Sequence, residues 1–559
     1  MDVQAQPQKS RSLKARLGSL WRKLRGHPQA MDHSRFDGTY PEWRKQFADL
    51  DPKELADVKT LVETLTKETS FSLIIKRGQR DATPDTAKIL GQQLWESIPV
   101  VLVDEENGLM PEILPQNDWM IVVESGDLLR PYALLLIALK ISQEPKAQVI
   151  YGDEDFTTPT GELFPFLKPD WSPELFESTD YVGILAIRRQ LIVANAGDSI
   201  PLIEVSAKIL GTTPPENIHH IPHILAQRKS NSGSSNAHQR ARAIHAFHEA
   251  QGLKPRQVVI RSNSTLYVQH DLPVELPKVS VIIPSRDRKD LLSACVESVL
   301  EKTVYDNFEV ILIDNDSQQE ATKAWFREAE QLDRVQVHRY PHPFNFAAIN
   351  NFGVTKASGE ILIFLNDDTT VISSAWMSEL VRHAARAPIG AVGALLYYPN
   401  DTIQHAGVVC GISKAHIAGH LHRGASRYDI PGLAGFDCVQ NFSVVTGACL
   451  AVRKNVFEKV DGFDEDFSVC YNDVDLCLRI KQQGYRNAWT PHSVLYHHEN
   501  VSVAERNEEQ ARVYTAEAGL MRTRYGKELL HDPAFNPNFA LDGEGQVLAK
   551  EPRVNLPWR

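Results

Sequence analysis

The segment Ile361-Leu362-Ile363-Phe364-Leu365-Asn366-Asp367-Asp368 decides the fold that we predict for this chain of 559 residues. The unbroken apolar run is typical of a strand buried on both faces of a parallel sheet, and a pair of carboxylates follows it directly. Open α/β sheets bind ligands at the carboxyl ends of their strands, and carboxylate ligands suit a Mg²⁺ or Mn²⁺ ion that carries a diphosphate. Taken alone, Asn-Asp-Asp-Thr is also an ordinary turn or helix N-cap, so the surrounding sequence must decide.

Strand and helix patterns alternate over two long regions on either side of a linker punctuated by Pro273 and Pro277. The chain is too long for one hydrophobic core, and such alternation predicts α/β domains with mainly parallel sheets covered by helices. We therefore expect a basic arm (residues 1–30), a helical linker (31–68), two tandem α/β domains (69–265 and 266–545) and a C-terminal tail (546–559).

The two regions resemble each other in the order and approximate spacing of their apolar runs, which predicts an internal duplication. Two unrelated α/β domains with generic strand patterns are the alternative interpretation. The matching runs are Phe71–Ile75 with Val279–Ile283, Val100–Asp104 with Val310–Asp314, Trp119–Val123 with Ile361–Leu365, and Tyr181–Arg189 with Thr446–Arg453.

Composition excludes several classes of function. A net charge of -11 argues against general nucleic-acid binding. The six cysteines form no CxxC pair and fit no zinc spacing, so we expect reduced thiols and a cytoplasmic protein. No apolar run reaches the roughly 18 to 20 residues of a membrane span.

The arm at residues 1–30 places apolar side chains at helical spacing among lysines and arginines, and it lacks the apolar core of a signal peptide. Such a helix can lie in an anionic membrane surface, which would place the protein peripherally on the inner face of the cell membrane. A solvated basic tail, or a helix docked on the protein's own acidic surface, is the alternative. The oligomeric state is open, and a homo-oligomer is compatible with the sequence.

Six motifs in the second region occur in an order and at a spacing that resemble glycosyltransferase family 2. The resemblance implies a nucleotide-sugar-binding GT-A fold and transfer with inversion at the anomeric carbon. The motifs are Val279-Ser280-Val281-Ile282-Ile283-Pro284-Ser285-Arg286-Asp287-Arg288, Ile313-Asp314-Asn315-Asp316-Ser317, Asn345–Asn351, Asn366-Asp367-Asp368, Thr446-Gly447-Ala448 and Tyr471-Asn472-Asp473-Val474-Asp475-Leu476.

The same resemblance assigns a donor site. Its implied residues are Pro284, Ser285, Arg286, Asp287, Asp314, Asn315, Asn345, Asn350 and Asp367. Asn315 stands where many relatives have a second Asp, and its amide would still suit a uracil or thymine edge, hence a UDP- or dTDP-sugar. Asn345 and Asn350 fall in the segment that closes over the diphosphate and sugar in similar proteins, although capping the helix after Phe346 is the alternative role.

The resemblance also implies a metal site for Mg²⁺ or Mn²⁺ at Asp368, with a further contact from His497. The ion would neutralise charge on the leaving diphosphate. His498 is the competing ligand, and a buried structural histidine is the competing role for His497.

Asp473 matches the catalytic base of the family, at the start of a helix that we expect to end at Gly484. The neighbouring motif position, which is commonly acidic, is Asn472. Asp475 lies about 200° further round the helix and is expected to be structural. The alternative role of Asp473 is a helix N-cap.

The first region departs from the motifs where chemistry is expected. Lys76 replaces the loop proline, Glu124-Ser125-Gly126-Asp127 replaces the Asp pair, and no acid-Asp-x-Asp-Leu helix follows Arg189. We interpret this copy as degenerate, serving dimerisation, acceptor binding or stabilisation. A bifunctional enzyme with two active sites is the competing view.

Together these patterns predict an inverting, metal-dependent glycosyltransferase that moves a sugar from a nucleotide-sugar donor to a saccharide acceptor. By analogy with the family, the acceptor would be lipid-linked and the pathway that of a bacterial surface polysaccharide. The non-enzymatic alternative is a glycan-binding scaffold built from two decayed transferase domains.

Overall fold

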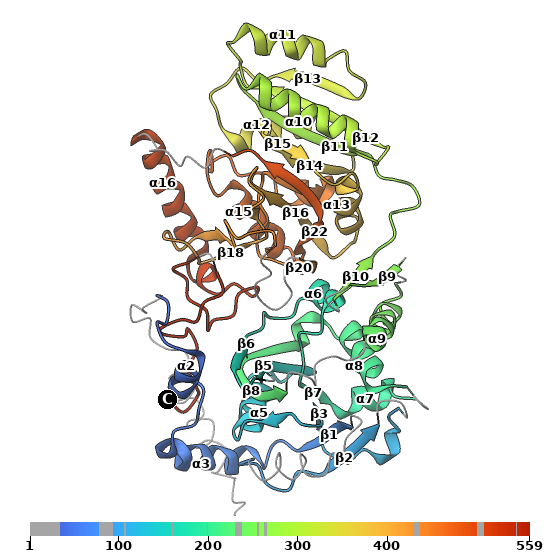
Figure 1. Ribbon diagram of the computed structural model, residues 1–559, viewed down its shortest axis with the longest axis vertical. Helices are drawn as coiled ribbons and strands as arrows, with labels where there is room; N and C mark the ends of the chain where they lie inside the picture. Colours follow the sequence, from blue (N-terminus) through green and yellow to red (C-terminus); the bar gives the residue numbers. More distant parts are fainter. Residues whose placement is uncertain are drawn as a thin grey trace, which may run out of the picture.

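A computed structural model of the protein describes residues 34–77, 93–104, 108–158, 160–197, 200–229, 237–253, 257–261, 265–428, 437–499, 508–543 and 545–559. Each half of the chain forms a large sheet flanked by helices, and the two halves lie one above the other in Figure 1. The division into two α/β regions that the sequence predicted is therefore visible in the structure.

The first sheet has the strand order β2-β1-β3-β7-β5-β8-β4, with β6 paired to β5. Its strands are β1 (Phe71–Arg77), β2 (Val100–Asp104), β3 (Trp119–Glu124), β4 (Leu128–Leu129), β5 (Val149–Thr157), β6 (Leu163–Phe166), β7 (Leu185–Arg188) and β8 (Ile218–Lys229). The accompanying helices are α5 (Ala133–Gln143), α6 (Pro173–Ser178), α7 (Arg189–Asn195), α8 (Leu202–Thr212) and α9 (Ala237–Ala250).

The second sheet has the order β13-β12-β11-β14-β21-β16-β22-β15, with β17 paired to β16 and β20 to β22. Its strands are β11 (Val279–Ser285), β12 (Phe308–Asp314), β13 (Val335–Arg339), β14 (Ile361–Leu365), β15 (Thr369–Val371), β16 (Ile389–Tyr397), β17 (Ile403–His405), β20 (Gln440–Asn441), β21 (Cys449–Arg453) and β22 (Arg486–His497). Its helices are α10 (Lys289–Lys302), α11 (Glu320–Ala329), α12 (Phe346–Lys356), α13 (Trp376–Ala384), α14 (Lys454–Lys459), α15 (Asn472–Gln482) and α16 (Glu508–Tyr525).

The two sheets share one strand order. The order of the second sheet results when each strand of the first is replaced by its counterpart: β1 by β11, β2 by β12, β3 by β14, β4 by β15, β5 by β16, β7 by β21 and β8 by β22. β6 and β17 occupy the same side position. The second sheet adds β13 at its edge. This agreement in topology matches the duplication read from the apolar runs.

Both sheets are mixed rather than uniformly parallel. β11 pairs in parallel with β12 and β14, as β1 does with β2 and β3. β21 and β7 run antiparallel to both of their neighbours. A helix precedes each of the parallel strands β12 and β14, whereas β21 is entered from a long loop region, so no crossover forces it to be parallel.

The core of the second domain follows the two-residue period of its strands. Val279, Val281 and Ile283 of β11 pack in one apolar cluster with α10 and α13, and Ile282 packs in the other with α12 and α15. Successive side chains of a strand point to opposite faces, so both faces of this sheet are covered by helices. All five residues of β14 are buried, as their unbroken apolar run predicted.

A junction of ion pairs joins the two domains. Glu174 of α6 lies 3.0 Å from Arg486 Nη2 at the start of β22 and 3.2 Å from Arg386 Nη2 after α13. A hairpin of β9 (Gln257–Ile260) and β10 (Leu266–Gln269) leads from the first domain to the second. The ion pairs hold the adjoining edges of the domains against each other.

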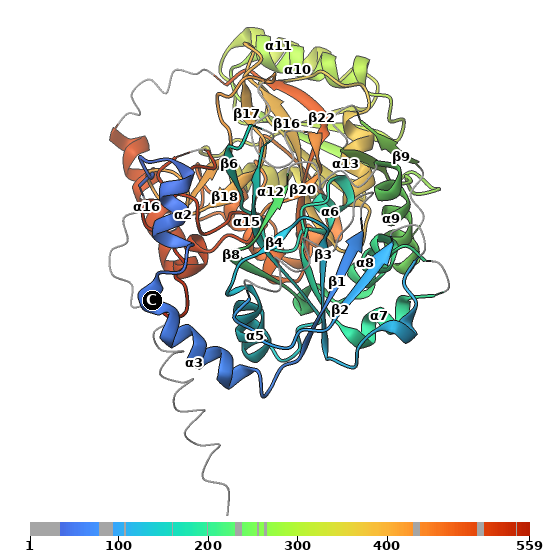
Figure 2. The same ribbon diagram turned by 60° about the horizontal axis from the view of Figure 1, so that its bottom comes forward.

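The C-terminal segment returns to the first domain, where it packs on α2 (Tyr40–Phe47) and α3 (Leu55–Leu65). The Trp43 indole donates to the carbonyl of Ala549 at 3.0 Å, and Trp558 packs on the Tyr132 ring. Figures 1 and 2 both show this red segment beside the blue helices. The predicted linker and tail thus pack together.

Within the ranges that the structure describes, we find no helix whose length and hydropathy would allow it to cross a membrane. The basic arm at residues 1–30 lies outside the described residues, so its predicted membrane contact stays a prediction.

Candidate active site

The loop after β11 meets the acidic pair that follows β14. Because β11 and β14 are parallel neighbours, their carboxyl ends lie at the same edge of the sheet. Ser285 Oγ donates to Asp367 Oδ2 at 2.6 Å, and both side chains are buried. The bond ties the first predicted donor loop to the predicted metal motif.

Arg288 is a further residue of this edge, to which the sequence analysis assigned no role. Its Nη1 lies 3.0 Å from Asp367 Oδ1, and its Nη2 lies 3.1 Å from Asp368 Oδ2. One guanidinium thus bridges both carboxylates from the loop that ends β11. Its side chain is 41% exposed, so solvent reaches this cation.

His497, rather than His498, lies beside the predicted metal ligand. It ends β22 opposite Thr369 of β15, and its Nε2 is 3.0 Å from Asp368 Oδ1. The Nε2 atom of His498 instead lies 2.8 Å from Thr370 Oγ1. Of the two adjacent histidines, the predicted one is therefore the one whose side chain lies against the Asp368 carboxylate.

The two carboxyl groups have opposite shifts in pKa. Burial raises the pKa of Asp367 above its ordinary value, although Ser285 and Arg288 work against this. Burial also opposes the charge of Asp368, but the contacts with His497 and Arg288 outweigh it and leave its pKa lowered. Asp368 is therefore the more readily ionised of the two carboxyl groups.

The donor set fits a divalent cation of the Mg²⁺ or Mn²⁺ type. Asp368 Oδ1 is buried and makes no hydrogen bond, although it faces His497 Nε2, and His497 Nδ1 is buried without a hydrogen bond as well. Buried carboxylate oxygens are costly to leave unpaired. A carboxylate and an imidazole at the open edge of the sheet are the ligands that such an ion would require.

A second group of ligand-type side chains lies at the domain junction. Among the described residues, Glu177, His248 and His270 bring ligand atoms within 4.8 Å of one another. The two imidazole Nε2 atoms already lie 2.9 and 2.8 Å from the Glu177 oxygens, and Arg386 lies 3.3 Å away. Since this carboxylate is already compensated, we interpret the group as a structural cluster, distinct from Asp368 and His497.

Asp473 lies in the first turn of α15, where the sequence placed it. Its Oδ2 accepts from the backbone N–H of Gly447 and its Oδ1 from that of Val474, each at 2.8 Å. Burial raises its pKa despite these two bonds, and a raised pKa favours uptake of a proton. Tyr471, two residues earlier, has φ 59°, a backbone strain of the kind found at functional sites.

Asp475 is fully buried and points away from this edge. It pairs with Arg479 at 2.7 Å and accepts a hydrogen bond from the Tyr525 hydroxyl at 2.7 Å. These contacts fit the structural role expected from its position on the helix.

Two of the residues predicted to hold the nucleoside, Asp287 and Asn315, form hydrogen bonds with backbone groups of neighbouring loops. Asp287, at φ 52°, accepts from the N–H groups of Gln318 and Gln319 and so joins the loops after β11 and β12. Asn315 donates from Nδ2 to the carbonyls of Tyr340 and His342, and its Oδ1 is buried without a partner.

Three other residues predicted to bind the nucleotide-sugar donor lie near the surface or within the sheet. Asp314 accepts from the N–H of Ser317 at 2.8 Å, Arg286 is nearly half exposed, and Pro284 pairs with Ile313 within the sheet. The structure brings these residues to one edge, beside Asp367.

Asn345 and Asn350 both have structural partners. Asn345 caps α12 by accepting from the N–H of Ala348 at 3.0 Å, and it donates to the carbonyl of Glu465. Asn350 is fully buried and donates to the carbonyl of Phe346. The helix-capping alternative therefore describes Asn345, and contact of either residue with a donor stays a prediction.

The second sheet and its acidic edge form an α/β domain. Residues 280–460 match the family model described as glycosyl transferase family 2. The match falls on the domain whose motifs resemble this family. The matched stretch includes Ser285 and the Asp367-Asp368 pair, whereas Asp473 and His497 lie beyond its end.

Two curated relatives are similar along most of this chain. An uncharacterized protein of Sinorhizobium fredii (strain NBRC 101917 / NGR234), y4gI, is 35% identical over 497 residues, which are 83% of this chain and 54% of the relative. The O-antigen biosynthesis protein RfbC of Myxococcus xanthus is 34% identical over 453 residues, 78% of this chain and 35% of the relative. The chain thus spans about half of the first relative and about a third of the second.

Among solved structures, a crystal structure of GalNAc-T7 with UDP, GalNAc and Mn²⁺ is 18% identical with a TM-score of 0.38. The similarity covers 46% of this chain and 50% of that chain.

Proposed function

We propose that the second domain catalyses inverting, metal-dependent transfer of a sugar from a nucleotide-sugar donor to a saccharide acceptor. The observation that carries the proposal is the edge where Asp367, Asp368 and His497 meet, with a buried oxygen of Asp368 lacking a hydrogen bond. A UDP- or dTDP-sugar is the proposed donor, by the chemistry expected of the loops that follow β11 and β12.

Asp473 is the proposed general base. Its carboxylate would take the proton of the acceptor hydroxyl while that oxygen attacks the anomeric carbon. The bond from the anomeric carbon to the diphosphate oxygen breaks in the same step, and the nucleoside diphosphate leaves. Attack opposite the leaving group inverts the configuration of the sugar.

Asp368 and His497 would hold the divalent cation, which, when bound, offsets negative charge on the leaving diphosphate. Ser285 keeps Asp367 in place from the neighbouring strand. Arg288 bridges both carboxylates, so it balances their charge until a donor enters. These contacts prepare the edge for a diphosphate without rearrangement of the sheet.

The proposal extends to the acceptor and the cellular location. Similarity to a protein named for O-antigen biosynthesis supports a role in a bacterial surface polysaccharide, with a lipid-linked saccharide as acceptor. The basic composition of residues 1–30 supports peripheral binding at the inner membrane face. The first domain is proposed to be non-catalytic.

A donor screen tests the proposal. UDP-, dTDP- and GDP-sugars are added to the full chain with Mn²⁺ or with EDTA, and the melting temperature is measured. A true donor should stabilise the protein only with the metal, because a ligand of the folded state raises the melting temperature. The responding donor is then tested for release of its nucleoside diphosphate. If none of the donors raised the melting temperature in a metal-dependent way, the proposal would be contradicted.

A further inference from the structure

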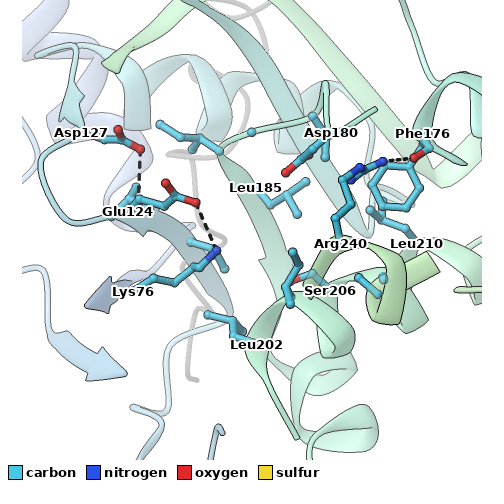
Figure 3. A pocket seen from close by; sticks show the side chains of 18 of the residues that line it. Lys76, Glu124, Asp127, Phe176, Asp180, Leu185, Leu202, Ser206, Leu210 and Arg240 are labelled. Carbon is cyan, nitrogen blue, oxygen red and sulfur yellow. Dashed lines mark hydrogen bonds and ion pairs between the residues drawn. The ribbon is translucent and has the colours of Figure 1, made fainter. Parts of the chain in front are cut away.

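A pocket lies at the edge of the first sheet that corresponds to the candidate active site of the second. Its empty space is about 590 Å³ when the open solvent at its mouth is included. Figure 3 shows Lys76 and Glu124 from the carboxyl ends of β1 and β3 on one side, and Ser206 of α8 and Arg240 of α9 on the other. The degenerate copy has thus kept a pocket.

An arginine occupies the acidic edge of this pocket, where the second sheet has its metal motif. Arg228 of β8 lies 3.2 Å from Glu124, 3.4 Å from Asp127 and 3.6 Å from Glu154. β8 corresponds to β22, which carries His497, and β4, directly after Asp127, corresponds to β15. The guanidinium of Arg228, which is part of the chain, therefore takes the place of a metal ion that could dissociate.

The charges that line the pocket balance. Its cationic residues are Lys76, Arg228 and Arg240, and its carboxylates are Glu124, Asp127 and Asp180. Lys76 lies 3.2 Å from Glu124, and Arg240 donates to the carbonyl of Phe176. No surplus of positive charge is available for a nucleoside diphosphate, and Arg228 opposes entry of a divalent cation.

Apolar side chains line the pocket between these charged groups. They are Val122, Val182, Leu185, Leu202, Leu210 and the ring of Phe176. A pocket that combines a neutral set of donors and acceptors with apolar side chains matches a sugar ring, which offers hydroxyl groups and a C–H face.

We propose that this pocket binds a neutral saccharide unit of the acceptor without a metal ion. The assignment of the ligand to the acceptor rests on the proposed function, whereas the pocket chemistry does not. α6 supplies Phe176 to the pocket and Glu174 to the ion pairs with the second domain, so the bound unit lies next to the domain junction. The first domain would then hold the acceptor chain while the second elongates it.

Saturation-transfer NMR on the full chain tests the binding, with EDTA present and no nucleotide. The probes are free glucose, galactose, mannose, rhamnose and N-acetylglucosamine, each at millimolar concentration, and UDP serves as the anionic probe. We expect signal from at least one sugar and none from UDP. No signal from any of the five sugars, or competition by UDP, would overturn the proposal.

Pocket variants locate the signal. Ser206→Phe fills the pocket from α8 and should abolish the sugar signal, and Glu124→Gln keeps the shape while weakening binding about 10-fold. Glu204→Gln is the matched control, because its ion pair with Arg242 lies outside the pocket lining. If both pocket variants bind like the control, the sugar site is elsewhere and the proposal fails. Donor turnover, measured in the same variants, reports separately on the second domain.

Replacement of Arg228 tests its role as the attached cation. In an Asp368→Asn background, which removes the proposed metal ligand of the second domain, Arg228→Gln removes the cation that lies beside three carboxylates, while Lys76 still pairs with Glu124 and Lys168 with Glu154. Mn²⁺ should then raise the melting temperature by roughly 2–4 °C, and it should not do so with Arg228→Lys. If Mn²⁺ changed the melting temperature equally in Arg228→Gln and Arg228→Lys, the conclusion that Arg228 takes the place of a metal ion would be wrong.

Discussion

The corresponding edges of the two sheets differ in how their carboxylates are compensated. In the second sheet the cation is Arg288, which comes from a loop and is 41% exposed, and one oxygen of Asp368 keeps no hydrogen bond. In the first sheet it is Arg228, which comes from a strand, is 15% exposed and lies near three carboxylates. The exposed loop cation could move aside for an exchangeable ion, whereas the less exposed strand cation is held by three carboxylates. We therefore expect a metal ion at the second edge and none at the first.

The largest expected effect is the loss of Asp473, the base that we propose for the second edge. Asp473→Asn keeps the shape of the side chain but cannot accept a proton, so kcat for sugar transfer should fall by about 10³-fold. Stabilisation by donor and Mn²⁺ should persist, because the carboxylate would act on the acceptor. Transfer assays and melting curves on the same preparation check both parts. Transfer at the wild-type rate in this variant would exclude Asp473 as the base.

Asp368→Asn should remove the metal dependence of donor binding. The variant loses the carboxylate that faces His497, so Mn²⁺ should no longer strengthen donor binding, which should weaken by about 10²-fold with the metal present. Calorimetric titration of the donor with Mn²⁺ and with EDTA measures the difference. Thr370→Val is a nearby control, since its hydroxyl contacts His498 instead. A metal effect that survives in Asp368→Asn would place the ion elsewhere.

Arg288→Gln should have opposite effects on the two binding events proposed for the acidic pair, binding of Mn²⁺ alone and binding of the donor. Without the guanidinium, the carboxylates should bind Mn²⁺ alone more tightly, because a competing cation is gone. Donor affinity should fall by about 10-fold, since we expect Arg288 to turn toward the diphosphate as the donor enters. Titrations with Mn²⁺ alone and with donor at saturating Mn²⁺ give the two constants. A decrease in both affinities would mean that Arg288 supports the edge rather than competes for it.

Much of this comparison can be predicted from the sequence, because it depends on apolar runs and on motif order. Ile361–Leu365 forms β14 with the predicted bounds, and α15 spans Asn472–Gln482, before the predicted stop at Gly484. The resemblance to glycosyltransferase family 2 also implied that His497 would lie near Asp368. These features are local or follow from the order of strands in the sheet.

Side-chain partners at the edges could not be predicted in the same way. Arg288 follows β11 and reaches the acidic pair at the end of the neighbouring strand β14, after a loop in which Asp287 has φ 52°, and no periodicity encodes that direction. Arg228 lies on β8 beside three carboxylates, a contact that no sequence pattern indicated. The packing of Trp43 against Ala549 joins residues at opposite ends of the chain. Such contacts depend on tertiary structure, which these sequence patterns do not predict.

The smallest expected effect concerns the helix that connects the two edges. Glu174→Gln removes the carboxylate that pairs with Arg386 and Arg486, and breaking such a buried pair costs about 3 kcal/mol of unfolding free energy at pH 7. Burial opposes the charge of Glu174, but the two arginines outweigh it and hold its pKa below the ordinary 4.5. A lowered pKa stabilises the fold above pH 4.5, and that contribution is lost as the pH falls further.

Urea denaturation of wild type and Glu174→Gln at pH 7 and at pH 3.5 therefore gives a large difference at the first pH and a smaller one at the second. Glu204→Gln, at an ion pair with the half-exposed Arg242, should change stability by less than about 0.5 kcal/mol at either pH. A pH-independent difference would assign the effect to packing of α6 rather than to charge. Because α6 also carries Phe176 of the sugar pocket, a loosened junction in Glu174→Gln should weaken sugar binding in the first domain as well, whereas two independent domains would leave it unchanged.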